Sequence, residues 1–138
     1  MMIKQVIVMR THYPDGKGGL RKVRTGKMIA QGAHASMGAL LSAKKTWMYA
    51  QPAQLMLQVD KEAQAWLEGK FTKIVLGVRT EEELLALHKK AKDAGLLCSL
   101  IQDAGDTEFG GMPTYTALGI GPASSEKIDQ ITADLSLI

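Results

Sequence analysis

Three polar side chains with helical spacing, Lys27, Gln31 and His34, are the first candidates for chemistry in this chain of 138 residues. At about 100° per residue they lie in one narrow stripe of a helix. With a rise of roughly 1.5 Å per residue, Gln31 is about 6 Å and His34 about 10 Å from Lys27 along the axis. A lysine in the first helical turn opposes the helix dipole, so helix stability alone does not explain Lys27. The stripe indicates either a site that needs a cation, with His34 at its border, or a solvent-exposed polar face.

Asp103 is the second candidate, because it stands where an apolar predicted strand, Leu96–Gln102, comes to an end. Ligands of open α/β sheets bind beyond the carboxyl ends of strands. The loop that enters the Lys27 helix follows the first predicted strand, so both residues lie at one edge of the sheet if those strands are parallel. This arrangement predicts a Lys27–Asp103 pair. An Asx-turn formed by Asp103 with the small residues after it is the alternative.

Alternating strands and helices must position these residues. Helices are expected over about Gly26–Lys45, Asp60–Gly69, Thr80–Ala94 and Ser124–Leu135, with Thr25 and Thr80 as N-terminal caps. Strands are expected at Lys4–Met9, Lys73–Val78, Leu96–Gln102 and Thr114–Ile120. This order predicts one domain, residues 1–138, folded as a three-layer α/β/α sandwich with a mixed, mostly parallel four-stranded sheet.

The positive charge of the chain is concentrated in its first part. Residues 1–58 hold nine Lys and Arg and one acidic residue, a charge of +8, whereas residues 59–138 hold eight and thirteen, a charge of −5. Six of the basic residues are close together in sequence: Arg10, Lys17, Arg21, Lys22, Arg24 and Lys27. Such a cluster is typical either of a site for a polyanion, above all nucleic-acid phosphate, or of a solvated basic loop.

Other features narrow the class of protein. One cysteine, Cys98, excludes an internal disulfide and a cysteine-cluster metal site, and it suits a reducing, cytoplasmic environment. No apolar run approaches the roughly 20 residues that span a bilayer. The three histidines, at positions 12, 34 and 88, lack the spacing of metal ligands, so we expect no metal.

Three motifs occur in order along the chain. They are Gly26-Lys27-x-x-Ala30-Gln31-x-Ala33-His34-Ala35, Leu100-Ile101-x-Asp103-Ala104-Gly105-x-Thr107 and Leu118-Gly119-Ile120-Gly121-Pro122. Over nearly its whole length the chain resembles the archaeal and eukaryotic type, or type II, of the peptidyl-tRNA hydrolases. The resemblance implies hydrolysis of the ester between a peptide and the ribose of the terminal tRNA adenosine. It also implies peptidyl-tRNA as the partner and no cofactor, and a homodimer is compatible with it.

The resemblance implies catalytic roles for Lys27, Asp103 and Thr107, and it places Gln31 and His34 at matching helix positions that face the substrate. In the expected reaction Asp103 orients or deprotonates a water, directly or through Thr107, while Lys27 stabilises the oxyanion. The basic residues expected to bind the tRNA phosphates are Lys17, Arg21, Lys22 and Arg24.

Three departures from the family pattern surround this expected site. The loop between Arg10 and Gly26 is longer than usual, Asp106 stands where a basic residue is common, and residues 108–112 form a different loop. Two alternatives therefore stand beside hydrolysis of peptidyl-tRNA. One is a module that binds tRNA or a partner without turnover, and the other is a hydrolase of a different acyl ester or amide.

Overall fold

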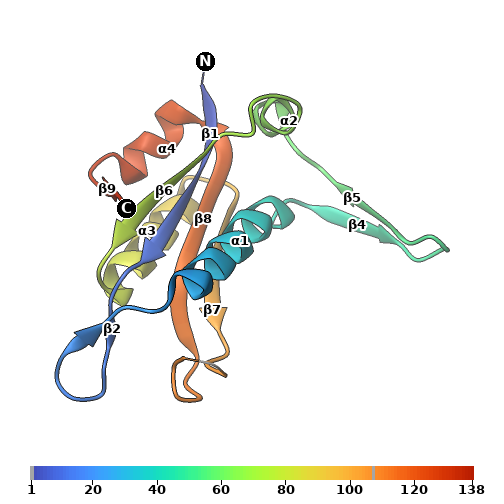
Figure 1. Cartoon of the computed structure of the whole chain (residues 1–138). Coiled ribbons are helices and arrows are strands. Elements are labelled where there is room, and N and C mark those ends of the chain that lie inside the picture. The colour runs from blue at the N-terminus through green and yellow to red at the C-terminus, as the bar shows by residue number, and fades with distance from the viewer. Residues whose placement is uncertain (1, 107) are drawn as a thin grey trace.

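The computed structural model describes residues 2–106 and 108–138 and contains a central sheet flanked by helices (Figure 1). In this part of the chain five strands form the sheet, in the order β7-β8-β1-β6-β9. They are β1 (Ile3–Arg10), β6 (Lys73–Val78), β7 (Cys98–Asp103), β8 (Thr114–Ser124) and β9 (Ser136–Leu137). The helices are α1 (Thr25–Leu41), α2 (Lys61–Glu68), α3 (Glu81–Asp93) and α4 (Ser125–Thr132). The expected α/β class is confirmed, but the sheet has a fifth strand, β9, which is too short to show a hydrophobic period.

The pairing of the strands corrects the expectation of a mostly parallel sheet. Only β1 and β6 pair in parallel among the described strands, whereas β8 pairs antiparallel with both β1 and β7, and β9 pairs antiparallel with β6. Because β8 is antiparallel to both of its neighbours, β1 and β7 run in the same direction without touching. Their carboxyl ends therefore reach the same edge of the sheet, which is the arrangement that a Lys27–Asp103 pair requires.

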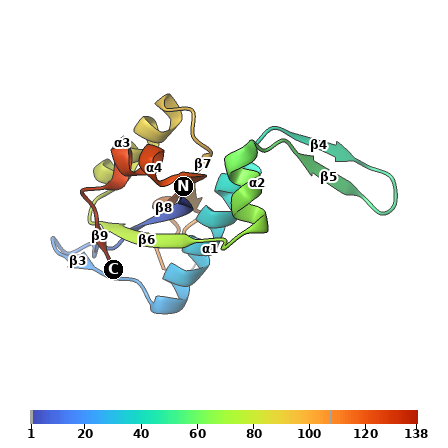
Figure 2. The ribbon, with the colours of Figure 1, turned by 90° about the horizontal axis from the view of Figure 1, so that it is seen from above.

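The helices cover both faces of the sheet. Helix α1 packs on one face, and α3 and α4 pack on the other, as the view from above shows (Figure 2). Successive residues of β1 alternate between two buried clusters: Ile7 and Met9 pack toward α1, and Val6 and Val8 pack toward α3 and α4. This double burial explains why the strand is apolar on both faces.

Helix α1 lies unusually close to β8. A Cβ atom built on Gly119 of β8 would stand 2.1 Å from the carbonyl oxygen of Ala35 and 3.0 Å from the Cβ of Ala39. Ala35 and Ala39 are both fully buried. These two small residues of α1 therefore let the helix pack closely on the sheet, and this packing sets the distance of Lys27 and Gln31 from it.

Two helix starts follow the sequence, whereas both ends of α1 depart from it. Asp60 accepts from the Ala63 amide over 2.8 Å at the start of α2, and Thr80 accepts from the Glu83 amide over 3.1 Å at the start of α3. The expectation for Thr25 was wrong, because the N-cap of α1 is Arg24, which makes no side-chain capping bond. The same helix ends at Leu41 rather than near Lys45 because a strand begins there.

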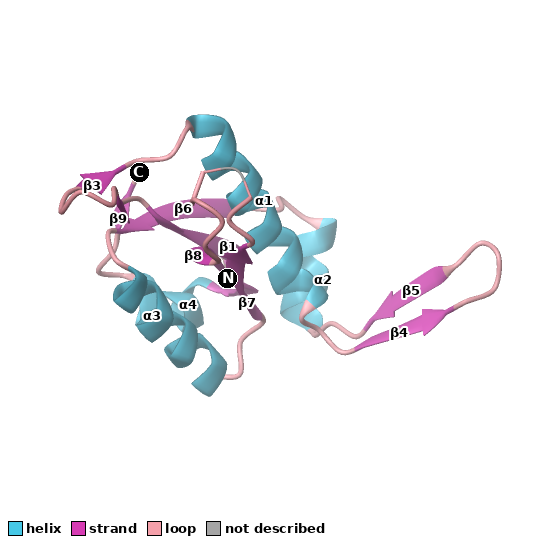
Figure 3. Ribbon diagram, turned by 90° about the horizontal axis from the view of Figure 1, so that it is seen from below, coloured by secondary structure: helices cyan, strands magenta, loops and turns pink. Residues whose placement is uncertain are grey.

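Two hairpins were not predicted. Strands β2 (Tyr13–Pro14) and β3 (Leu20–Arg21) pair inside the long loop before α1. Strands β4 (Lys45–Met48) and β5 (Gln54–Leu57) pair in an arm that extends away from the body of the protein (Figure 3). The arm was missed because its sequence has apolar residues on both faces and therefore no strand alternation. Among the described residues, none of the helices combines the length and apolarity needed to cross a membrane.

Candidate active site

An ion pair between Lys27 of α1 and Asp103 of β7 forms the centre of the candidate site. The Lys27 Nζ lies 2.9 Å from the Asp103 Oδ1, and the two side chains are only 13% and 14% exposed. Lys27 lies in the first turn of α1, and Asp103 is the last residue of β7. The structure thus contains the predicted pair, and the carboxylate offsets the unfavourable placement of a cation at a helix start.

Gln31 holds the Asp103 carboxylate from the next turn of α1. Its Nε2 donates to the Asp103 Oδ1 over 3.3 Å, and its Oε1 accepts from the Thr116 hydroxyl over 2.5 Å. Gln31 and Thr116 are 4% and 0% exposed, so leaving either without its hydrogen bond would be costly. The sequence did not indicate Thr116, because its position beneath Gln31 depends on the register of β8.

The second oxygen of Asp103 closes a turn. Its Oδ2 accepts from the Gly105 amide over 2.9 Å, which is the Asx-turn considered as the alternative role of Asp103. The two expected roles therefore occur together. The hydrogen bond from Lys27, supported by that of Gly105, holds the pKa of Asp103 below its usual value against the opposing effect of desolvation. The carboxylate is consequently ionised at neutral pH.

The aromatic rings of Phe109 and Tyr13 pack together beside the Lys27–Asp103 ion pair. The two ring centroids are 4.8 Å apart, and the Lys27 Nζ lies 5.7 Å from the centroid of Phe109, within the range of a cation–π contact. Burial raises the pKa of Tyr13 to about 12, and its hydroxyl donates to the Arg10 carbonyl over 3.2 Å. Phe109 lies in a loop and Tyr13 in the two-residue strand β2, so no period in the sequence indicated that they pack together.

The basic residues between Lys17 and Arg24, called here the basic segment, have different surroundings in the fold. The Arg21 guanidinium donates to the Glu108 carbonyl oxygen, and Arg24 forms an ion pair with the Glu108 carboxylate. Lys17 is exposed in the turn between β2 and β3, and Lys22 lines a separate hollow. Two of the four residues predicted to bind phosphate, Arg21 and Arg24, therefore hold the loop of Glu108 beside the site.

Two predicted site residues remain, His34 and Thr107. His34 is exposed on α1, three residues after Gln31, and its place at the border of the ion pair stays a prediction. Thr107, expected to be catalytic, lies outside the described residues.

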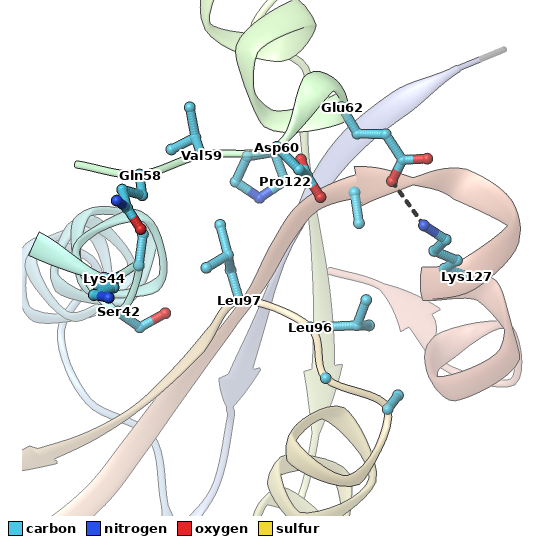
Figure 4. A pocket seen from close by; sticks show the side chains of 14 residues that line it. Ser42, Lys44, Gln58, Val59, Asp60, Glu62, Leu96, Leu97, Pro122 and Lys127 are labelled. Carbon is cyan, nitrogen blue, oxygen red and sulfur yellow. Dashed lines mark hydrogen bonds and ion pairs between the residues drawn. The ribbon is translucent and has the colours of Figure 1, made fainter.

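A hollow of about 400 Å³ at the opposite end of α1 is separate from this site (Figure 4). Ser42, Asp60 and Lys127 are among its lining residues, and Lys127 pairs there with Glu62 over 3.1 Å. Ser42 follows Lys27 by fifteen residues, which corresponds to about 22 Å along the helix axis. The hollow is therefore too far from Lys27 and Asp103 to share their chemistry.

Gln31→Glu should slow the chemistry at this site without unfolding the protein. The variant keeps an oxygen for Thr116 but places a second carboxylate beside Asp103, and two neighbouring carboxylates raise the pKa of one of them. We expect kcat of the ester hydrolysis predicted from the sequence to fall at least about 10-fold near pH 7.5. It should recover partly at lower pH, because one of the two carboxyl groups is then protonated. The pH profile of kcat measures this. Gln130→Glu, which makes the same change at an exposed position of α4, is the matched control, and equal profiles for both variants would contradict a positioning role for Gln31.

Comparison with known proteins identifies the family. Residues 3–138 match the family described as Peptidyl-tRNA hydrolase PTH2. The proteins named peptidyl-tRNA hydrolase from Methanopyrus kandleri and Methanocaldococcus jannaschii are 42% and 38% identical to this chain; the alignments cover 99% of it and 99% and 100% of those proteins. The protein of the same name from Halobacterium salinarum is 40% identical, over 98% of this chain and 99% of its own. On this evidence the chain belongs to the peptidyl-tRNA hydrolase PTH2 family.

Proposed function

We propose that this chain hydrolyses the ester bond of peptidyl-tRNA, releasing free tRNA and peptide. The ion pair of Lys27 and Asp103 carries the proposal, because it holds a cation and an anion 2.9 Å apart with little exposure to solvent. Ester hydrolysis needs both charges, one to position water and the other to stabilise the oxyanion. Family membership supports the choice of substrate, since relatives of full length are named for this activity.

In the proposed reaction a water attacks the carbonyl carbon that joins the peptide to the ribose. The tetrahedral intermediate carries a negative charge on the former carbonyl oxygen, and the Lys27 ammonium stabilises that charge. Collapse of the intermediate breaks the bond from this carbon to the ribose oxygen. The ribose oxygen takes up the proton lost by the water, so the products are a peptide acid and a tRNA with a free terminal hydroxyl.

Asp103 is better suited to orienting the water than to acting as a strong base. The lowered pKa of Asp103 makes its carboxylate a weak proton acceptor. Among the described residues, Lys27, Gln31 and Gly105 donate to its oxygens. A carboxylate has about four acceptor positions, so Asp103 has the capacity to accept from a water as well. A relay through Thr107 stays a prediction.

The proposal includes the tRNA part of the substrate as a partner and the cytoplasm as the place of action. Exposed Lys17 and Lys22 are the members of the basic segment best placed to meet phosphates, because Arg21 and Arg24 contact Glu108. A homodimer is a further part of the proposal. It is supported by the exposed apolar side chains of the arm, such as Tyr49, which is 81% exposed.

Turnover of an N-blocked aminoacyl-tRNA by the purified chain tests the proposed function. We expect release of the blocked amino acid at a rate proportional to the protein concentration, with free aminoacyl-tRNA in parallel as the control for spontaneous ester loss. Binding of tRNA without turnover would contradict the proposal and favour a binding module. Turnover of other acyl esters in place of this one would favour a hydrolase of different specificity.

A further inference from the structure

A second hollow, of about 410 Å³, opens beyond the carboxyl ends of the parallel strands β1 and β6. The residues that follow β1, Thr11 and His12, lie on one side of it, and Arg79, which follows β6, lies on the other. Lys22 and Met28 also contribute to its lining. Its volume falls within the range of pockets that bind small molecules.

The path of the chain explains why a hollow forms here. The chain leaves β1 to form α1 on one face of the sheet, and it leaves β6 to form α3 on the other face (Figure 2). Where neighbouring parallel strands send their connections to opposite faces, a crevice opens at their carboxyl ends, and open α/β sheets bind ligands in that crevice.

Two cationic side chains, Lys22 and Arg79, line the hollow. Within residues 2–106 and 108–138, no Asp or Glu side chain lines it, and neither Lys22 nor Arg79 takes part in an ion pair. Arg24 differs in this respect, since it forms an ion pair with the Glu108 carboxylate, whereas Arg21 donates to the Glu108 carbonyl oxygen. Like charges around one hollow repel each other, and an anion between them would remove the repulsion.

His12 lines the same hollow, and the charges of Lys22 and Arg79 affect the pKa of its ring. The Thr11 hydroxyl donates to the Val78 carbonyl over 3.1 Å, and its oxygen lies 2.7 Å from the His12 Nδ1, so Thr11 links the ends of β1 and β6 to the ring. Desolvation, then Arg79 and then Lys22 lower the pKa of His12. An anion bound between the cations would act in the opposite direction and raise it.

The geometry points to a phosphate-binding site formed by Lys22, Arg79 and His12, which holds a backbone phosphate of the substrate RNA while the ester lies at Lys27 and Asp103. This inference rests on the proposed function for the choice of RNA. Met28, the neighbour of Lys27 in α1, lines the hollow, so an RNA strand can pass from one site to the other around the start of the helix. Contacts to phosphate position a strand without reading its sequence.

The test uses the whole chain and two probes, inorganic phosphate and deacylated tRNA. In the wild type, inorganic phosphate should raise the pKa of His12, which is measured by NMR of its ring. In the Lys22→Gln, Arg79→Gln double variant it should have no such effect. The same variant should bind deacylated tRNA about 10-fold more weakly at low salt. The slope of the logarithm of its binding constant against the logarithm of the salt concentration should be smaller in magnitude by about two. Lys90→Gln, at an exposed position of α3, is the matched control and should behave as the wild type.

Two results would overturn the inference. A His12 pKa that does not respond to phosphate would show that the hollow holds no such anion. A response to phosphate together with unchanged tRNA binding by the double variant would show that the site does not serve RNA. Because tRNA binding is measured without turnover, a wild type that binds tRNA but fails to cleave the ester would contradict the proposed function alone.

Discussion

Asp103→Asn is expected to lower the rate of peptide release from bound peptidyl-tRNA by at least about 10²-fold, and Lys27→Ala by a similar factor. Asparagine keeps the size of the side chain but removes the charge that Lys27 and Gln31 contact, at 2.9 Å and 3.3 Å. Alanine at position 27 removes the cation proposed to meet the oxyanion. Single-turnover release with protein in excess measures the chemical step, and tRNA affinity measured separately shows whether binding is kept.

A surface ion pair offers the matched control for these variants. Lys89 and Asp93 lie 2.8 Å apart on α3, but their side chains are 78% and 66% exposed. Lys89→Ala and Asp93→Asn make the same chemical changes there and should leave release within about twofold of the wild type, since exposed pairs contribute little. Release rates of the Lys27 and Asp103 variants that match these controls would contradict the proposed mechanism.

The pKa of Asp103 gives the same variants a second readout. Its pKa is lower in the folded chain than its usual value, so the carboxylate stabilises the fold above the usual pKa and loses that contribution as the pH falls through the folded pKa. Lys27→Ala removes the largest cause of this lowering. The pKa of Asp103 should therefore rise in this variant, as measured by NMR of its carboxyl carbon. The pH at which the protein unfolds in acid should rise as well.

Gly119→Ala is expected to destabilise the fold by about 3 kcal/mol, near the upper end of the usual cost of overpacking. The added Cβ would stand 2.1 Å from the Ala35 carbonyl oxygen, and backbone cannot rotate away as a side chain can. Helix α1 would have to move off the sheet, carrying Lys27 and Gln31 with it, so peptide release should fall as well. Urea unfolding and single-turnover release measure the two effects.

Gly32→Ala is the control for this substitution, because Gly32 lies in α1 and its added Cβ would meet the Met9 Sδ at 3.6 Å and the Ile7 Cγ2 at 3.8 Å, which are ordinary van der Waals contacts. Alanine is the better helix former, so this variant should be more stable by about 0.5–1 kcal/mol. A Gly119→Ala protein as stable as the wild type would show that α1 does not depend on this close approach.

The elements that hold the site were largely predictable, because they are long and have clear periods. The strand at Lys73–Val78 was predicted with its observed bounds, and Thr80 marks the start of α3 as expected. The pairing of Lys27 with Asp103 followed from one assumption, that their strands run in the same direction. That assumption holds even though most of the sheet pairs antiparallel, because β8 lies between the two strands.

The features that were missed depend on contacts between residues far apart in sequence. Thr116 meets Gln31 through the register of β8, and Glu108 meets Arg24 across 84 positions. Phe109 lies in a loop and Tyr13 in the short strand β2, and no local pattern determines that they pack together. In each case the residue type was visible in the sequence, but its partner was fixed only by the fold.

A double-mutant cycle at Lys27 and Asp103 tests most directly whether the two residues act as one unit. The rates to compare are single-turnover release by the wild type, Lys27→Ala, Asp103→Asn and the double variant. If the ion pair is the reaction centre, the double variant should be about as slow as the slower single variant, since groups that act together are not additive. Losses that multiply, so that the double variant is slower by about 10⁴-fold, would contradict the ion pair as a single catalytic unit.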